Sequence, residues 1–397
     1  MTGGQTARGS GSEALLTGAR IGILIDRWEP ARGGGEAALF ALAQRLSSEG
    51  AELTIFAERA DTTGLPPNAS WTPVRSQGLT RSRREASLAH ALVDAARTAN
   101  MELLIGTRHL AELDLYWPHG GSYEVSLRAR RESRGQALES TPRGRHKLFL
   151  ELERELLTGG ARRIACVSEL VERELALAYP ACADRLVTIP NAVDLDRFHP
   201  RERLGDAGSG RALRRELDVP EERPLVVFSA REPKLKGLPQ LLRALGARTA
   251  LDFTLLVAGV RRPESWRRLS RKLGLEARTL FLAEADPVAL SSAADLCVLP
   301  TWRDTSSLVI LECLASGTPV LTTERAGAAN LIREHEVGTV LADPGDTDAL
   351  RQALEARLAG FAPAGLAARE RVRSSVREHG REEWLDALVA EVVALRS

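Results

Sequence analysis

Short apolar runs alternate along the chain with longer amphipathic stretches. The first run, Ile21 to Asp26, is followed by a glycine-containing loop, a helical pattern over Glu36 to Glu49, and a second apolar run, ELTIFAE. An apolar run, a turn, an amphipathic helix and another apolar run predict a strand–helix–strand unit with parallel strands.

The same alternation continues and then starts again. Further strands are predicted at 102–106, 163–168 and 185–190, and a polar, turn-rich segment follows over 191–210. A second series of strands is then predicted at 224–230, 252–259, 278–283, 294–300 and 318–323, with helices between them and a last amphipathic helix over roughly 377–395. We therefore predict an α/β fold with two Rossmann-like, doubly wound domains that face each other across a cleft.

Length supports two domains, because 397 residues exceed one typical domain. We predict a disordered leader over 1–19, an N-terminal domain over 20–197 and a C-terminal domain over 198–375. The remaining segment, 376–397, is expected to cross back to the N-terminal domain.

Composition argues against several classes of protein. The net charge of +1 gives no general attraction to nucleic acid, and no apolar run approaches the roughly 18 residues needed to span a bilayer. The four cysteines form neither a CxxC pair nor a zinc-type pattern with histidine. We expect a cytoplasmic protein with reduced thiols, no secretion signal, no metal site and no nucleic-acid partner.

A basic loop follows the predicted strand at 224–230. It reads REPKLKG and contains Arg231, Lys234 and Lys236, although the whole chain has only four lysines. Cations at the end of a parallel strand, beside a helix N-terminus, suit a diphosphate. A solvated basic loop is the alternative.

An acidic motif follows the predicted strand at 294–300. It reads PTWRDTSSLVILECLASGT, and we expect a helix to begin near Ser306 with Thr305 or Ser306 as its cap. The backbone amides of Ser306, Ser307 and Leu308 would then offer an anion site, with Asp304 in the loop before them. Glu312 lies in an otherwise apolar helix, where a carboxylate needs a partner. A ribose diol or a salt bridge to an arginine could supply it.

Together these segments resemble the family 4 glycosyltransferases, which retain anomeric configuration and have the two-domain GT-B fold. The resemblance covers the chain from about residue 20, and its motifs are DTSSLVILE (acid, seven residues, glutamate), CLASGTPVLTT, SAREPKLKGLPQLLRAL, the stretch ending in IPNAVDLDRFHP, and RWEPARGGGEAALFALAQRL. The PTW-x-D and PHGG forms are similar to the lipopolysaccharide core α-glucosyltransferase type. Asp304 stands where the family more often has glutamate.

The resemblance implies roles for individual residues. Glu312 would bind the donor ribose, Asp304 the hydroxyls of the transferred sugar, and Lys236 with Arg231 or Lys234 the diphosphate, helped by the amides of Ser306, Ser307 and Leu308. Gly34 and Gly35 would let the backbone approach donor or acceptor, and His119 would lie near the donor sugar. A satisfied core histidine is the alternative for His119. The donor would be a nucleotide-diphosphate sugar, expected to be a UDP-sugar, with no metal or other cofactor.

The reaction implied is transfer of a hexose-type sugar to a glycan or glycolipid hydroxyl, in cell-envelope polysaccharide or lipopolysaccharide synthesis. The motifs contain no obvious protein nucleophile, so a front-face displacement assisted by the leaving diphosphate fits best. Arginine-rich stretches at 127–147 and 81–84 suit peripheral contact with an anionic membrane on its inner face. Solvated arginine-rich helices are the alternative.

Three other functions are compatible with parts of the pattern. The first is another GT-B enzyme, such as a sucrose- or glycogen-type transferase or a sugar-nucleotide epimerase. The second is a nicotinamide enzyme, which the absence of a G-x-G-x-x-G motif disfavours. The third is a non-catalytic sugar-nucleotide-binding scaffold, which Lys236, Asp304 and Glu312 disfavour.

Overall fold

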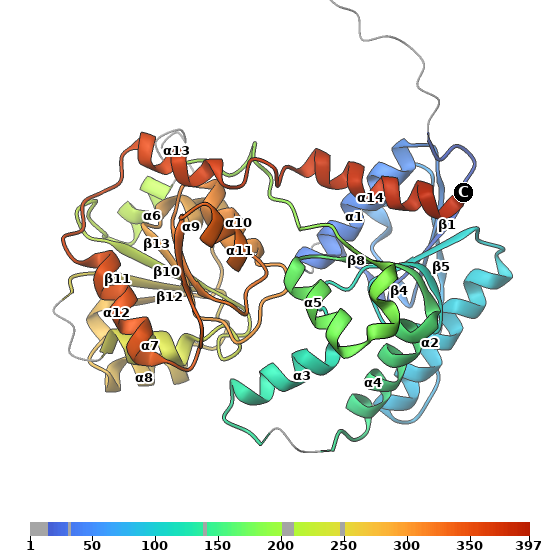
Figure 1. The fold of residues 1–397 in the computed structure, drawn as a ribbon, viewed down its shortest axis with the longest axis horizontal. Helices are drawn as coiled ribbons and strands as arrows, with labels where there is room; N and C mark the ends of the chain where they lie inside the picture. The colour runs from blue at the N-terminus through green and yellow to red at the C-terminus, as the bar shows by residue number, and fades with distance from the viewer. Residues whose placement is uncertain (1–14, 31–32, 138–140, 201–209, 247–250) are drawn as a thin grey trace, which may run out of the picture. The chain divides into compact units, whose positions relative to one another are not determined.

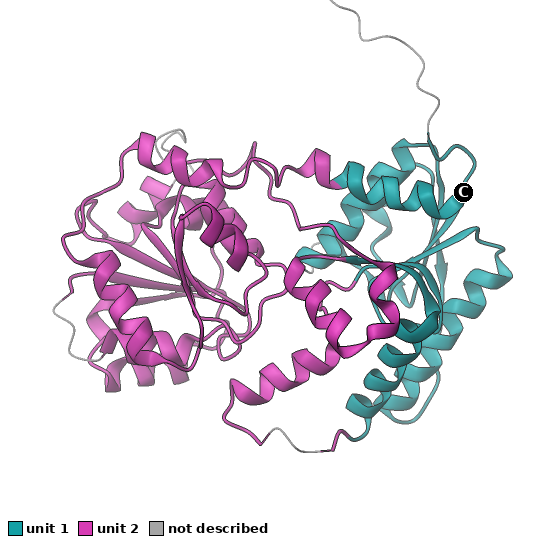
Figure 2. Cartoon of the chain, in the orientation of Figure 1, with its two compact units in different colours: residues 1–117, 143–165, 385–397 teal, residues 118–142, 166–384 magenta. Residues whose placement is uncertain are grey.

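The computed structural model describes residues 15–30, 33–137, 141–200, 210–246 and 251–397. The chain divides into two compact units, shown in teal and magenta in Figure 2. Unit 1 comprises residues 1–117, 143–165 and 385–397, and unit 2 comprises residues 118–142 and 166–384.

The strands of unit 1 pair in parallel in the order β5-β3-β1-β6-β7-β8. Strands β1, β5 and β8 are labelled in Figure 1. The strands are β1 (Arg20–Leu24), β3 (Glu52–Ala57), β5 (Ala69–Pro73), β6 (Leu103–Gly106), β7 (Leu113–Tyr116) and β8 (Ala161–Cys166). The central strand β1 pairs on both sides, so Ile21, Ile23 and Leu24 are fully buried. Such apolar runs are typical of parallel strands covered on both faces.

The helices of unit 1 connect these strands or pack beside them. They are α1 (Gly34–Ser48), α2 (Arg81–Thr98), α4 (Arg145–Glu155) and, from Leu385 onward, α14 (Arg381–Arg396). On α14, Asp386 pairs with Arg45 of α1, and Glu391 lies 2.8 Å from Arg163 of β8. The C-terminal segment is therefore part of unit 1.

Unit 2 contains a second parallel sheet, in the order β12-β11-β10-β13-β14-β15. The strands are β10 (Leu225–Ser229), β11 (Thr254–Ala258), β12 (Thr279–Leu282), β13 (Leu296–Leu299), β14 (Val320–Thr323) and β15 (Gly338–Leu341). The order changes direction at β10, which has β11 on one side and β13 on the other. In open α/β sheets ligands bind at such a point, outside the carboxyl ends of the strands.

Alternate residues of these strands fill two separate cores. Val226 and Phe228 belong to a large cluster on one face, whereas Leu225 and Val227 belong to a smaller cluster on the other. Because successive side chains of a strand point to opposite faces, this division shows that helices cover both faces of the sheet.

Helices α3, α5 and α6 of unit 2 precede its sheet in sequence, and the other helices follow its strands. The helices of this unit are α3 (Tyr123–Glu132), α5 (Glu169–Ala178), α6 (Gly210–Glu216), α7 (Leu238–Gly246), α8 (Glu264–Lys272), α9 (Pro287–Ala293), α10 (Leu308–Ala315), α11 (Ala329–Glu334), α12 (Thr347–Leu358) and α13 (Leu366–Ser374). The short strand β9 (Leu186–Thr188) also belongs to this unit.

The two predicted doubly wound parallel sheets are confirmed. Most of the predicted leader and part of the predicted turn-rich segment, residues 1–14 and 201–209, lie outside the described residues. Leu16, which was assigned to the leader, is fully buried, and its amide donates to Glu49 O at 3.0 Å. The predicted domain boundaries stay predictions.

Several elements differ from their predicted limits or were not predicted. The last helix begins at Arg381 rather than near residue 377. Strands β5, β7 and β15 were not predicted. Each has only four or five residues and contains polar or small ones, such as Ser70, Asp114 and Gly338. All four cysteines are buried, and none of them forms a disulfide. Within the described ranges, no helix is long and apolar enough to cross a bilayer.

Gly237, at the N-terminus of α7, gives a test of this packing. Its φ is +83°, and an added Cβ would collide with the carbonyl oxygen of Pro300. We expect Gly237→Ala to lower the free energy of unfolding by more than the about 1–2 kcal/mol that a left-handed conformation alone costs. Urea unfolding measures this.

The matched control is Gly274→Ala, because Gly274 has a φ of +74° and nothing within 4 Å of an added Cβ. We expect this variant to show the conformational cost only. Equal losses in the two variants would contradict the close approach of Gly237 to Pro300.

Candidate active site

The candidate site lies in unit 2, where two neighbouring strands end. Strands β10 and β13 are hydrogen-bonded in parallel, with Val226 opposite Leu296 and Val227 opposite Cys297. The loop after β10, residues 231–237, carries the predicted basic residues, and we call it the basic loop. The loop after β13, residues 300–307, carries Asp304, and we call it the acid loop. Because the strands are parallel neighbours, both loops leave the same edge of the sheet.

Backbone hydrogen bonds join the two loops. The amide of Trp302 donates to Leu235 O at 2.8 Å, and the hydroxyl of Thr301 donates to the same oxygen at 3.3 Å. Within the basic loop, the amide of Lys236 donates to Glu232 O at 3.0 Å. The position of Lys236 relative to the acid loop is therefore fixed by the backbone as well as by its side chain.

Lys236 and Asp304 form an ion pair at the junction. Lys236 Nζ lies 2.9 Å from Asp304 Oδ2 and donates to Arg303 O at 3.2 Å. The two side chains are 22% and 12% exposed, so the pair is partly shielded from water but still accessible. An ammonium has three N–H donors, and these contacts use two of them. One donor of Lys236 remains for a ligand.

The Asp304 carboxylate also sets the start of helix α10. Its Oδ1 accepts the amide of Ser307 at 3.0 Å, and Ser307, at φ 52° and ψ 37°, is the residue before the helix. The helix begins at Leu308, so the predicted start near Ser306, with Thr305 or Ser306 as cap, is wrong. The left-handed conformation of Ser307 is the physical reason, since it cannot be part of a right-handed helix.

The predicted anion site of three backbone amides therefore has only two amides available. The Ser307 amide is bonded to Asp304, whereas the amides of Ser306 and Leu308 have no hydrogen-bond partner among residues the structure describes. Asp304 itself is held by its backbone, because its amide donates to Arg325 O at 2.9 Å and its carbonyl accepts from Gly327 at 2.7 Å.

Arg303 was not predicted as a site residue, although it lies inside the PTWRD motif. Its side chain is 6% exposed, and its Nε and Nη2 lie 3.3 and 2.5 Å from the Glu174 carboxylate of α5. Its Nη1 donates to Gly120 O at 2.7 Å. The neighbouring Thr305 hydroxyl donates to His119 O at 2.7 Å. The acid loop therefore holds the backbone of the PHGG segment.

These contacts place His119 beside the acid loop through its backbone. Burial lowers the pKa of the His119 imidazole to about 4. The ring is therefore neutral at pH 7 and would serve as a hydrogen-bonding group for a neutral hydroxyl rather than as a cation for phosphate. A pKa near 4 also makes it a weak general base. Its predicted position near a donor sugar stays a prediction.

Glu312 lies in α10, about one turn after its first residue, Leu308. Burial is the main influence on its carboxyl group and raises the pKa to about 7, with opposing effects from Arg197, which lowers it, and Asp286, which raises it. Arg197 forms its own contact with Asp286 at 3.4 Å. No residue in the described parts of the chain forms an ion pair or hydrogen bond with the Glu312 carboxylate, so the predicted alternative of a salt bridge to an arginine is wrong.

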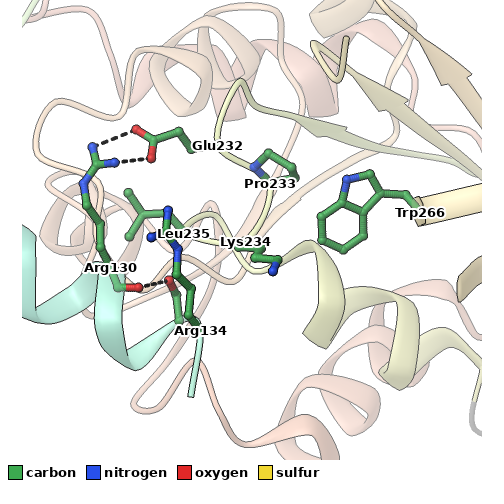
Figure 3. Close-up of a pocket in the computed structure, with 8 residues that line it drawn as sticks. Arg130, Arg134, Glu232, Pro233, Lys234, Leu235 and Trp266 are labelled. Atoms are coloured by element: carbon green, nitrogen blue, oxygen red, sulfur yellow. Dashed lines mark hydrogen bonds and ion pairs between the residues drawn. The ribbon is translucent and has the colours of Figure 1, made fainter. Parts of the chain in front are cut away.

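Lys234 occupies a different place from Lys236. It lines a cavity of ≈ 260 Å³ together with Pro233 and the Trp266 ring of α8 (Figure 3). Arg130 of α3 closes one side of this cavity through two hydrogen bonds to Glu232, one of them at 2.8 Å (Figure 3). Of the two lysines in the basic loop, Lys236 is the one that contacts Asp304. Arg231 is exposed in the same loop.

The remaining predicted residues and charges are distributed over both units. Gly34 and Gly35 form the first turn of α1 in unit 1. In the basic stretch 127–147, Arg128, Arg130, Arg145 and Lys147 each form an ion pair with a glutamate. These pairs reduce the charge available to a membrane. No group of three or more His, Cys, Asp or Glu side chains in the described segments could hold a metal ion.

Comparisons with known families assign both halves of the chain. The family described as Glycosyltransferase Family 4 matches residues 32–197, and the family described as Glycosyl transferases group 1 matches residues 223–359. The second match includes the basic loop, the acid loop and Glu312.

Named relatives agree with this assignment. The chain is 29% identical over 351 residues to D-inositol 3-phosphate glycosyltransferase 2 of Catenulispora acidiphila, which covers 79% of this chain and 80% of that protein. It is also 29% identical over 351 residues to the D-inositol 3-phosphate glycosyltransferase of Thermomonospora curvata, with the same coverage.

Solved structures share the fold. WaaG, a glycosyltransferase involved in lipopolysaccharide biosynthesis, superposes with a TM-score of 0.77 at 20% identity, covering 94% of this chain and 99% of that chain. Sucrose-phosphate synthase from Thermosynechococcus elongatus superposes with a TM-score of 0.74 at 20% identity, covering 95% of this chain and 99% of that chain. Anabaena HepE in complex with UDP-glucose superposes with a TM-score of 0.70 at 17% identity, covering 94% of this chain and 99% of that chain.

The fold and the two matched domains define a class. The chain belongs to the glycosyltransferases with the GT-B fold. It is an enzyme of the hexosyltransferase kind.

The contact between Arg303 and Glu174 can be tested by a double-mutant cycle. Both side chains are largely buried, so we expect a coupling energy of about 2–3 kcal/mol from the unfolding of Arg303→Ala, Glu174→Ala and the double variant. The exposed pair Arg271–Glu276, whose side chains are 64% and 63% exposed, should give about 0–1 kcal/mol. Equal coupling energies in the two pairs would contradict the inference that the buried Arg303 side chain holds the acid loop in place.

The raised pKa of Glu312 has a consequence for stability. The folded protein holds this proton more tightly than the unfolded chain does, so stability present below pH 4.5 is lost as the pH rises to about 7. Glu312→Gln removes the buried charge, so we expect the variant to be about 1–3 kcal/mol more stable than the wild type at pH 8 and to lose this advantage toward pH 4.5.

Unfolding measured across this pH range checks the expectation. The matched control is Glu222→Gln, because Glu222 is exposed in a loop of the same unit. A stability difference for Glu312→Gln that does not change with pH would show that the Glu312 carboxylate is solvated.

Proposed function

We propose that this glycosyltransferase moves a hexose from a UDP-sugar to a hydroxyl group of a glycan or glycolipid, with retention of anomeric configuration. The observation that carries the proposal is the position of Lys236. Its ammonium is partly exposed at the carboxyl edge of the sheet, has one remaining donor, and shares the Asp304 carboxylate with the amide of Ser307. A cation and helix N-terminal amides at one point suit a diphosphate.

Lys236 would neutralise the diphosphate as it leaves. The ion pair with Asp304 and the hydrogen bond to Arg303 O hold the ammonium in place before a ligand arrives. A preorganised charge needs little rearrangement when negative charge develops on the leaving group, which is the main advantage of such sites. Arg231, and Lys234 from its separate cavity, would add to the positive potential.

Asp304 and His119 would position the transferred sugar. Each Asp304 oxygen accepts one hydrogen bond, from Ser307 or Lys236, and retains capacity to accept another from a sugar hydroxyl. The neutral His119 imidazole would hydrogen-bond the same sugar. Precise placement of the sugar carbon beside the acceptor oxygen would supply a large part of the rate.

Glu312 would bind the ribose of the donor. Its carboxylate has no partner within the described chain, and burial makes its charge costly. Two ribose hydroxyls would donate to it and stabilise the ionised form. The amides of Ser306 and Leu308, at the start of the same helix, would contact the diphosphate, and Ser307 would contribute through its bond to Asp304.

The chemical step follows from these roles. The bond between the sugar C1 and the diphosphate oxygen breaks, and a bond from C1 to the acceptor oxygen forms on the same face. The acceptor proton passes to the leaving diphosphate oxygen, so no protein base, metal ion or other cofactor is required. Gly34 and Gly35 would let the backbone of α1 approach the donor or acceptor.

We place the reaction in cell-envelope polysaccharide or lipopolysaccharide synthesis, on the cytoplasmic side and with peripheral membrane contact. WaaG, named as a glycosyltransferase of lipopolysaccharide biosynthesis, shares the fold and supports this choice. HepE, solved with UDP-glucose, supports the choice of donor. The named relatives, which are inositol phosphate glycosyltransferases, support instead an acceptor that carries phosphate.

Lys236→Ala tests the proposal most simply. We expect kcat for sugar transfer or donor hydrolysis to fall about 10²–10³-fold, as when one preorganised charge donor is removed from an active site. The fold should persist, which circular dichroism and thermal unfolding check.

Lys272→Ala is the control, because Lys272 is exposed at the end of α8. It should leave kcat unchanged. Full activity in Lys236→Ala would refute the diphosphate assignment, and nucleotide-sugar binding without turnover in the wild type would favour a non-catalytic scaffold.

A further inference from the structure

A cavity of ≈ 750 Å³ in unit 1 is lined by five arginines. Arg27 follows β1, Arg59 follows β3, Arg75 follows β5, and Arg81 and Arg84 lie in the first turn of α2. The three strands are parallel neighbours, so their carboxyl ends lie at one edge of the sheet, where ligands of α/β proteins bind. The cavity has the size of a small-molecule site.

Two of these arginines occupy opposite positions in a small two-stranded sheet. Strands β2 (Arg27–Trp28) and β4 (Arg59–Ala60) pair in parallel, with Arg27 directly opposite Arg59. Like charges placed opposite each other on neighbouring strands destabilise the pair. An anion between the two guanidinium groups would remove this cost.

The first turn of α2 has a second unfavourable arrangement at the same cavity. The turn contains Arg81, Arg83 and Arg84 and no acidic residue. The N-terminus of a helix carries a partial positive charge, so basic side chains there are electrostatically unfavourable. The two arrangements belong to different elements, and both place positive charge at one cavity.

Three acids and five arginines line the cavity, so the arginines remain in excess. The Glu58 carboxylate accepts hydrogen bonds from the amide and hydroxyl of Ser76, and Glu85 forms an ion pair with Arg108 at 2.9 Å, with Asp26 as the third acid. Throughout the described segments, no side chain forms an ion pair or hydrogen bond with any of the five lining arginines. The excess positive charge and the N–H donors of these arginines are therefore available to a ligand.

We propose that this cavity binds the phosphate monoester of a phosphorylated acceptor. A dianionic phosphate can accept several charge-assisted hydrogen bonds, and guanidinium groups bind it in a bidentate manner. The cavity has room for the sugar or polyol that carries the phosphate. The identity of the ligand as an acceptor rests on the proposed function, whereas the anion site rests on unit 1 alone.

Calorimetric titration at low ionic strength tests the site. The probes are inorganic phosphate, glycerol 3-phosphate as a soluble phosphate ester, and vesicles of phosphatidic acid in a neutral lipid. In the double variant Arg81→Gln/Arg84→Gln we expect the affinity for both soluble phosphates to fall about tenfold or more, since two charged hydrogen-bond donors are lost. The matched control, Arg83→Gln, changes a residue of the same helical turn that does not line the cavity, and it should change the affinity less than about twofold.

Three results would overturn the inference. One is unchanged phosphate affinity in the double variant, and another is an equal loss in Arg83→Gln, which would indicate general surface charge. The third is a loss of vesicle binding only, which would indicate a membrane patch. Binding of UDP-glucose, measured in the same variants and in Lys236→Ala, separates this inference from the proposed function. Phosphate binding at the cavity should persist in Lys236→Ala, and nucleotide binding should persist in the arginine variants.

Discussion

The parallel pairing of β10 with β13 is the constraint on which the candidate site depends. It brings the ends of two strands that lie about seventy residues apart in sequence to one edge of the sheet, so the basic loop and the acid loop meet there. The hydrogen bonds from Trp302 and Thr301 to Leu235 O then fix the loops against each other, and the Lys236–Asp304 pair forms at their junction. The close approach of Gly237 to Pro300 is part of the same contact, since only a residue without a Cβ fits there.

The acid loop takes part in two ion pairs, of which one is accessible and the other is buried. In the accessible pair, Lys236 and Asp304 each retain hydrogen-bonding capacity for a ligand. The buried Arg303–Glu174 pair and the Thr305 hydroxyl hold the PHGG backbone against the acid loop. The buried pair is better understood as a positioning device than as a source of stability, because burying two charges costs nearly as much as their attraction returns. Glu312 differs from all of these, because its carboxyl group is buried without a partner.

The sequence predicted the two parallel sheets and the residue types of the site, because strand–helix alternation and the loops that follow strands can be read from apolar periodicity. It did not predict the role of Arg303, whose partners Glu174 and Gly120 lie more than a hundred residues away and depend on tertiary folding. It also placed the start of α10 too early, because the Asp304–Ser307 hydrogen bond and the left-handed Ser307 follow from loop geometry rather than from capping preference. For the arginines at 81–84 the sequence predicts either membrane contact or a solvated helix, because the opposite positions of Arg27 and Arg59 follow from strand pairing that the sequence does not show.

The central claim is that Lys236 and the amides at the start of α10 form one diphosphate-binding site. A crystal structure of the protein with UDP bound tests it most directly. The account predicts a phosphate oxygen within about 3 Å of Lys236 Nζ, with the diphosphate beside the amides of Ser306 and Leu308 and the ribose hydroxyls at Glu312. A diphosphate bound away from Lys236, with the Lys236–Asp304 pair undisturbed and no ribose contact to Glu312, would contradict it.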